Sequence, residues 1–267
     1  MTQTIKSKDG TLIAYEKAGQ GKPLILVDGA LCSRKFGPSQ ALVLVLARHF
    51  TVFTYDRRGR GESGDTLPYA VDHEVEDLGA LLKKAGGSVF VFGVSSGAVL
   101  GLLAAAKRLP IKKLALYEAP FIVDNSRPGM EGTWLKIDQA VQAGDRSKAV
   151  AKFLKAVGVP AFGVFLMKLF PLWAKLKAVA HTLPYDGAIV KDYQNGKPLS
   201  AGRWKTVKIP TLVLDGGKSP QWMRNAMRSL AEVLPKARYQ TLEGQAHDAA
   251  KAASALEPVL TKFFSEP

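Results

Sequence analysis

The stretch VFVFGVSSGA, residues 89–98, joins an apolar, β-favouring run to the helix-forming segment AVLGLLAAA at residues 98–106. Its centre is the pattern Gly-x-Ser-x-Gly, in which Ser95 stands between Gly93 and Gly97. A serine on a sharp strand-to-helix turn has a strained backbone and an exposed hydroxyl, and the glycines let neighbouring backbone pass where a Cβ would collide. The helix that follows favours negative charge at its N-terminus. This context makes Ser95 the candidate nucleophile.

Apolar runs and helix-forming segments alternate over most of the chain. The runs PLILV (23–27) and TVFTY (51–55) are short, continuous and apolar, which is typical of strands buried on both faces. An antiparallel hairpin is predicted around Asp9-Gly10. Further strands are predicted at 113–117, 211–215 and 238–242, and helices at 39–49, 71–84, 98–106, 220–234 and 250–264. The alternation predicts an α/β fold whose mostly parallel sheet is covered on both faces.

Polar residues follow the predicted strands. They are Asp28, Asp56, Ser95, Glu118, Asp215 and His247. Ligands bind beyond the carboxyl ends of the strands in such sheets, so we expect these side chains to gather at one edge.

Composition limits the classes of function. The chain has 267 residues, 47% of them hydrophobic, and a net charge of +14. The basic residues are scattered among apolar helices without a nucleic-acid motif, so we expect a lysine-rich surface and no nucleic-acid partner. The apolar stretch 161–180 is interrupted by lysines and a proline, which argues against a membrane span. The single cysteine and the absence of an apolar leader segment predict a cytoplasmic protein.

Three features together resemble the α/β-hydrolase fold family, and the resemblance covers nearly the whole chain. They are the serine turn, the loop DRRGRGES at residues 56–63, which is similar to the family's D-x-R-G-x-G-x-S loop, and His247 after the last predicted strand. The resemblance implies a hydrolase core at residues 1–123 and 209–267. It also implies that the helix-rich segment 124–208 is an inserted helical cap, whose Trp and Phe side chains would line an apolar cleft.

The resemblance assigns His247 as the base that takes the proton of Ser95. The acid that orients this base is less clear, because the family's usual acid position holds Ser219. Glu118 follows the predicted strand at 113–117, where the segment LYEA resembles haloalkane dehalogenases that carry their acid there. We favour Glu118 and keep Asp215 as the alternative acid. Asp124 is a third option, although it suits a helix cap better.

The backbone amides of Ala30 and Ser96 are expected to bind the oxyanion. Ala30 follows Asp28-Gly29, where the family usually has His-Gly. A carboxylate near a developing oxyanion would repel it. We therefore expect Asp28 to have a structural role, either accepting amides of its own loop or pairing with Arg57.

These residues predict a serine hydrolase that cleaves a small, apolar carboxylic ester through an acyl-enzyme and needs no cofactor or metal. Carbon–carbon bond hydrolysis or lyase chemistry on the same residues remains an alternative. So does a non-catalytic ligand-binding protein on the same fold, which the unusual Asp28 and Ser219 would suit.

Overall fold

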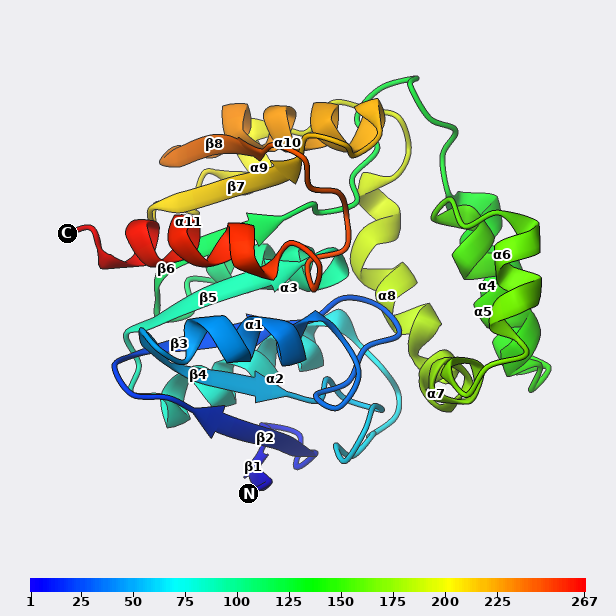
Figure 1. Ribbon diagram of the computed structural model, residues 1–267, viewed down its shortest axis with the longest axis horizontal. Coiled ribbons are helices and arrows are strands. Elements are labelled where there is room, and N and C mark those ends of the chain that lie inside the picture. Colours follow the sequence, from blue (N-terminus) through cyan, green and yellow to red (C-terminus); the bar gives the residue numbers. More distant parts are fainter.

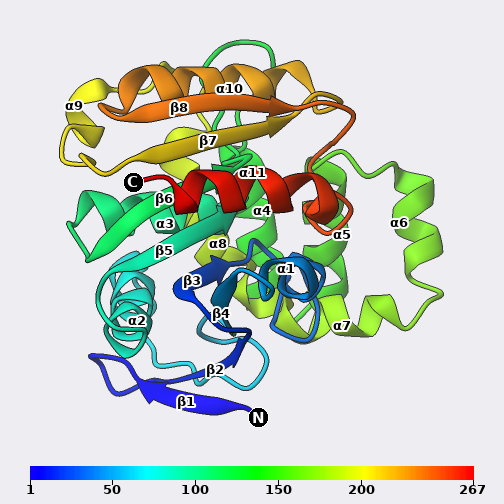
Figure 2. The ribbon, with the colours of Figure 1, turned by 60° about the vertical axis from the view of Figure 1, so that its left-hand side comes forward.

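The computed structural model describes residues 1–267 and contains one eight-stranded sheet. The strand order is β1-β2-β4-β3-β5-β6-β7-β8, which Figure 2 shows from β1 at the bottom to β8 at the top. Only β1 and β2 run antiparallel to their neighbours. The predicted α/β fold with a mostly parallel sheet is confirmed. The strands are β1 (Gln3–Lys6), β2 (Leu12–Ala18), β3 (Lys22–Val27), β4 (Phe50–Tyr55), β5 (Val89–Val94), β6 (Ile111–Tyr117), β7 (Thr211–Gly216) and β8 (Ala237–Leu242).

Helices cover both faces of this sheet. Helices α1 (Pro38–Leu46) and α11 (Ala253–Ser265) pack on one face, and α2 (Val71–Lys84), α3 (Ser96–Ala106) and α10 (Gln221–Val233) pack on the other. Strand β5 shows why its sequence is apolar at every position. Val89 and Val91 enter the core on the α3 side, while Phe90 and Phe92 enter the core on the α1 and α11 side. Alternating side chains of a central strand thus meet two separate cores.

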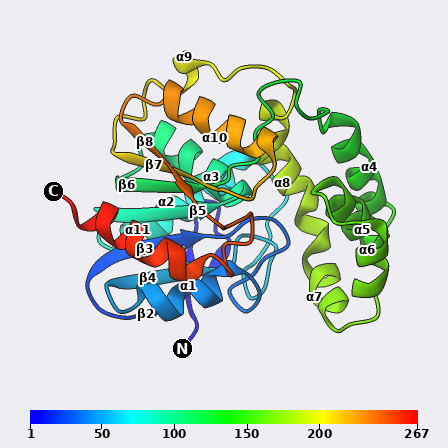
Figure 3. The same cartoon turned by 45° about the horizontal axis from the view of Figure 1, so that its top comes forward.

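The segment between β6 and β7 is helical and lies beyond the ends of the strands. Figure 1 shows helices α4 to α7 to the right of the sheet, with α8 between them and the strand ends, and Figure 3 shows the same grouping from another side. Short α9 returns toward β7. The bounds are α4 (Glu131–Gln142), α5 (Arg146–Ala156), α6 (Ala161–Met167), α7 (Leu172–Val179), α8 (Leu183–Val190) and α9 (Ala201–Trp204).

Two predicted helix bounds differ from the observed ones for local reasons. The first helix ends at Leu46 rather than at residue 49, because the chain turns there and the His49 amide bonds back to the Leu46 carbonyl. The last helix begins at Ala253 rather than at residue 250, because Asp248 accepts amides of the residues after it and forms a turn. None of the helices has both the length and the apolar character that crossing a membrane requires.

Candidate active site

Ser95 lies in a strained turn between β5 and α3. Its backbone has φ 56° and ψ −126°, a conformation that costs energy for a residue with a Cβ. The Ser95 amide donates to the Tyr117 carbonyl at 2.9 Å, which fixes the turn to the end of β6. A Cβ on Gly97 would lie 2.1 Å from the Val27 carbonyl oxygen, so only glycine lets β3 pass this close.

His247 meets a buried carboxylate. Its Nδ1 lies 2.7 Å from Oε2 of Glu118, whose side chain has no solvent exposure, while the histidine is about half exposed. The other oxygen of Glu118 accepts the Gly216 amide at 2.7 Å and the Ser219 hydroxyl at 2.5 Å. Ser219, which the resemblance places at the family's usual acid position, therefore donates to the carboxylate that contacts His247.

The other two candidate acids have different partners. Asp215 accepts the Tyr239 hydroxyl at 2.6 Å and lies 3.8 Å from Nε of Arg224. Asp124 accepts the amide of Ser126 in a local turn and also contacts an α10 side chain. The structure thus brings Glu118 to the ring of His247, while Asp215 and Asp124 hold other parts of the chain.

The predicted site residues line a common cavity of about 320 Å³. This volume is near the lower end of the range for small-molecule sites, about 300–1,000 Å³, so the cavity suits a small ligand. Its wall combines residues from the strand ends with residues from the helical segment. They include Ala30, Ser95, Ser96, Glu118, Pro120, Arg127, Met130, Trp134, Phe153, Val157, Val159, Asp186, Val190, Gln194, Trp222, Met223, His247 and Asp248.

Two backbone amides at this cavity are free to bind an anion. Ser96 is the first residue of α3, so its amide has no acceptor within the helix. The amide of Ala30 donates no hydrogen bond within the protein. Arg60 donates to the carbonyl of Gly29 at 2.6 Å. The carbonyl and amide of one trans peptide point in opposite directions, so this bond also fixes where the Ala30 amide points.

The pairing of the Asp28 side chain with Arg57, one of the two expected roles, was wrong. Its carboxylate is buried and neither oxygen has a hydrogen-bond partner, and Arg57 contacts only the main-chain carbonyl of Asp28, at 3.4 Å. Burial raises the pKa of Asp28 to about 6, although the nearby Ser39 and Arg60 oppose this shift. The loop directs its main-chain carbonyl, rather than its side chain, toward the arginine.

A buried charge network links the helical segment to the serine turn, and its central member, Asp186, belongs to no sequence motif. On α8, Asp186 lies 2.8 Å from Arg57 and 2.7 Å from Arg60, and it accepts the Ser96 hydroxyl at 2.7 Å. Glu74 forms two further bonds with Arg57. Burial alone would raise the pKa of Asp186, but Arg60 and Arg57 hold it below its ordinary value. The network joins α8 to both loops that carry the free amides.

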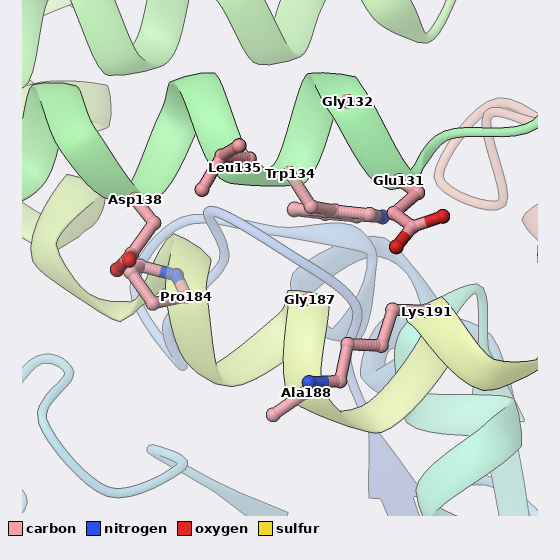
Figure 4. A pocket seen from close by; sticks show the side chains of 9 residues that line it. All are labelled: Glu131, Gly132, Trp134, Leu135, Asp138, Pro184, Gly187, Ala188 and Lys191. Atoms are coloured by element: carbon pink, nitrogen blue, oxygen red, sulfur yellow. The ribbon is translucent and has the colours of Figure 1, made fainter.

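Trp134 separates the cavity from a second hollow. Its indole donates to Gln194 at 2.7 Å, and Gln194 donates to the Pro120 carbonyl. Figure 4 shows the indole between α4 and α8, above Gly187, where a Cβ would lie 2.9 Å from the ring. The hollow on this side, about 690 Å³, is lined by residues of α4 and α8 and by Lys191, which directly follows α8. It contains no serine, cysteine or histidine, so we place the reactive chemistry in the smaller cavity.

The structure contains no group of three or more His, Cys, Asp or Glu side chains that could hold a metal ion. The single thiol, Cys32, lies 3.3 Å from the Ala30 carbonyl, and burial together with nearby Asp28 raises its pKa. The thiol is therefore kept protonated, which makes it a poor competitor of Ser95 as nucleophile.

Most of the chain matches known proteins. A model of the alpha/beta hydrolase family matches residues 30–256. A solved alpha/beta hydrolase of Sphaerobacter thermophilus is 49% identical, with a TM-score of 0.89; the match covers 98% of this chain and 100% of that chain.

Two curated relatives match over shorter segments. The uncharacterized hydrolase YraK of Bacillus subtilis is 36% identical over 97 residues, which is 35% of each chain. Ethanol acetyltransferase 1 of Cyberlindnera fabianii is 29% identical over 106 residues, 39% of this chain and 30% of its own length. The chain thus spans about a third of the length of the curated relatives it matches.

Proposed function

The chain belongs to the alpha/beta hydrolase family, and from that premise we propose that it is a serine hydrolase of carboxylic esters or related acyl compounds. The observation that carries the proposal is the contact between the Glu118 carboxylate and Nδ1 of His247, 2.7 Å apart, at a cavity that also contains the strained Ser95. Nucleophile, base and acid are then Ser95, His247 and Glu118.

In the proposed mechanism His247 takes the proton of Ser95 as the hydroxyl oxygen attacks the acyl carbon. Glu118 holds the imidazole in the tautomer with hydrogen on Nδ1 and stabilises the imidazolium that forms. The amides of Ala30 and Ser96 bind the developing oxyanion, and each such donor contributes about 3 kcal/mol in the transition state. His247 then gives its proton to the leaving alcohol, and in the second half it activates the water that releases the acid.

The helical segment 124–208 is proposed to act as a cap over the core formed by residues 1–123 and 209–267. Its position beyond the strand ends supports this role, as do the cavity residues it supplies, such as Met130, Trp134 and Phe153. A cap of this kind excludes water from the acyl-enzyme and shapes the space for the acyl group. Since the cavity is small and largely apolar, short acyl chains should be the preferred substrates.

Substitution of the nucleophile tests the proposal. Ser95→Ala should abolish hydrolysis of a panel of short esters and covalent labelling by a fluorophosphonate, while circular dichroism stays unchanged. Ser147→Ala is a matched control, because Ser147 lies on α5 and bonds to Trp173 rather than to the site. Failure of the wild-type protein to be labelled would favour a non-catalytic ligand-binding protein, whereas labelling without ester cleavage would favour carbon–carbon bond cleavage.

The similarity to an ethanol acetyltransferase suggests a second acceptor for the acyl group. An alcohol in place of water would convert hydrolysis into transesterification on the same acyl-enzyme. Product analysis with an ester in the presence of ethanol separates the two outcomes, since only acyl transfer yields a new ethyl ester.

A further inference from the structure

Among the charged side chains that line the catalytic cavity, Arg127 alone has no charged partner. The three carboxylates are all engaged: Glu118 with His247, Asp186 with two arginines, and Asp248 with Lys251 at 3.6 Å. Arg127 forms no ion pair with any of them. Burial lowers the pKa of Arg127, and no acidic group offsets this effect. A partly desolvated guanidinium without a counter-charge is costly, so its presence needs a reason.

The surroundings of Arg127 hold its guanidinium in place without neutralising it. The group lies over the ring of Trp222 on α10, with 4.2 Å between its central carbon and the ring centroid. One terminal nitrogen, Nη2, donates to the carbonyl of Ala156, the last residue of α5. No hydrogen bond within the protein involves Nε or Nη1. Two donor nitrogens of a positioned guanidinium are therefore available to an incoming group.

We propose that Arg127 binds a carboxylate of the substrate, so that the acyl compound cleaved at Ser95 is a small monoanion with an apolar stretch between its two ends. A planar guanidinium with free donors matches a carboxylate in shape and charge. Apolar side chains that line the same cavity, such as Met130 and Val159, suit a methylene chain. The net charge of +14 would attract such an anion from solution. This inference rests on the proposed hydrolase function and replaces the uncharged, apolar ester expected from the sequence.

A matched pair of substrates tests the proposal. Monoethyl adipate and ethyl hexanoate differ in one end group, a carboxylate in place of a methyl. Arg127→Met should lower kcat/KM for monoethyl adipate by about 10–100-fold, the range for a lost hydrogen bond to a charged group. It should change kcat/KM for ethyl hexanoate by less than about threefold. Arg127→Gln keeps a donor for Ala156 and should give the same selectivity if the methionine variant folds poorly.

Arg146→Met is the control variant, because it removes one positive charge from an exposed position on α5 outside this cavity. It should leave both esters unaffected. If the Arg127 variants lower kcat/KM for both esters equally, or for neither, the carboxylate-binding role is wrong while the hydrolase function stands.

Binding measurements separate this inference from the proposed function. In a Ser95→Ala background, calorimetry should show monoethyl adipate binding that Arg127→Gln weakens by at least about tenfold. If wild-type protein hydrolyses no ester of the panel and is not labelled by the fluorophosphonate, yet binding depends on Arg127, the anion site is correct and the hydrolase function is wrong. If binding does not depend on Arg127, the inference is overturned whatever the activity.

Discussion

The two carboxylate oxygens of Glu118 accept from three donors, so a substitution at this single residue tests its role as the acid. Glu118→Gln replaces two accepting oxygens with one oxygen and one NH2 group. At least one of the three donors therefore loses its acceptor. We expect kcat to fall by about 10³–10⁴-fold, the scale for neutralising the acid of such a triad. Asp215→Asn should reduce kcat far less, since Asp215 contacts Tyr239 and Arg224 instead. Ester hydrolysis under saturating substrate measures both effects, and the reverse ranking would give the role to Asp215.

Asp28 allows a prediction about stability. Its pKa is about 6 in the folded protein and 3.8 ordinarily, so the folded state prefers the protonated form. The raised pKa means that stability is lost as pH rises from about 4 through 6. Asp28→Asn removes this loss. It should add about 3 kcal/mol to the free energy of unfolding at pH 8 and less than about 1 kcal/mol at pH 4.

Urea denaturation of both proteins across this pH range measures the effect of Asp28→Asn. An equal increase in the free energy of unfolding at pH 4 and pH 8 would show that ionisation of the Asp28 carboxylate is not its cause. A loss of stability at pH 8 would mean that the side chain has a partner in solution.

The residues that the sequence could and could not identify differ in a physical way. Ser95 and His247 stand next to strands with recognisable patterns. The sequence does not decide whether Glu118 or Asp215 is the acid, because both stand at the end of a buried strand. Only contacts in the folded protein distinguish the two. Asp186 lies on helix α8 and Arg127 lies in the loop before α4, and neither belongs to a recognisable motif. Their roles depend on which distant groups face them, and no local periodicity encodes that.

At the scale of elements, helix α8 is joined to the core by charge as well as by packing. Asp186→Asn would leave Arg57 and Arg60 buried with one carboxylate fewer between them. Removing one partner from a buried ion pair typically costs about 3–5 kcal/mol, and we expect a loss of that size in urea denaturation. Asp192→Asn, the same change at an exposed position just after α8, should cost less than about 0.5 kcal/mol.

The Asp186 variant should also affect activity through the loops that the network holds. Arg60 orients the peptide between Gly29 and Ala30, and Ser96 itself bonds to Asp186. If Asp186→Asn were as stable as the wild type, the network would position the catalytic loops without adding to the free energy of unfolding. The substitution would then lower kcat alone.

The elements of the core were predictable because each strand and helix has a local signal, as β5 shows with its continuous apolar run. The helical segment was predictable only as helical and aromatic. Its arrangement over the strand ends depends on contacts between distant residues, such as the Trp134 indole over Gly187. A glycine in the middle of an apolar helix does not reveal from sequence which side chain needs its space.

At the scale of the whole molecule, the net charge of +14 bears on the substrate class. If the substrate is a monoanion, its encounter with the protein is accelerated at low ionic strength. We expect kcat/KM for monoethyl adipate to fall severalfold as sodium chloride rises from about 20 to 500 mM. Ethyl hexanoate, which has no charge, should show little change under the same conditions. Equal salt dependence of the two esters would point to an effect of salt on the protein itself.

The link between Asp186 and the two arginines also orders events during synthesis of the chain. Arg57 and Arg60 precede their carboxylate partner by 129 and 126 residues. At about 5–20 residues per second, a ribosome needs on the order of ten seconds to bridge that distance. By the end of this interval the nascent chain contains strands β1 to β6 and the serine turn but still lacks the carboxylate of Asp186. The loops that carry the free amides can therefore reach their final positions only after the inserted helices have been translated. An unfinished chain thus lacks the complete catalytic arrangement.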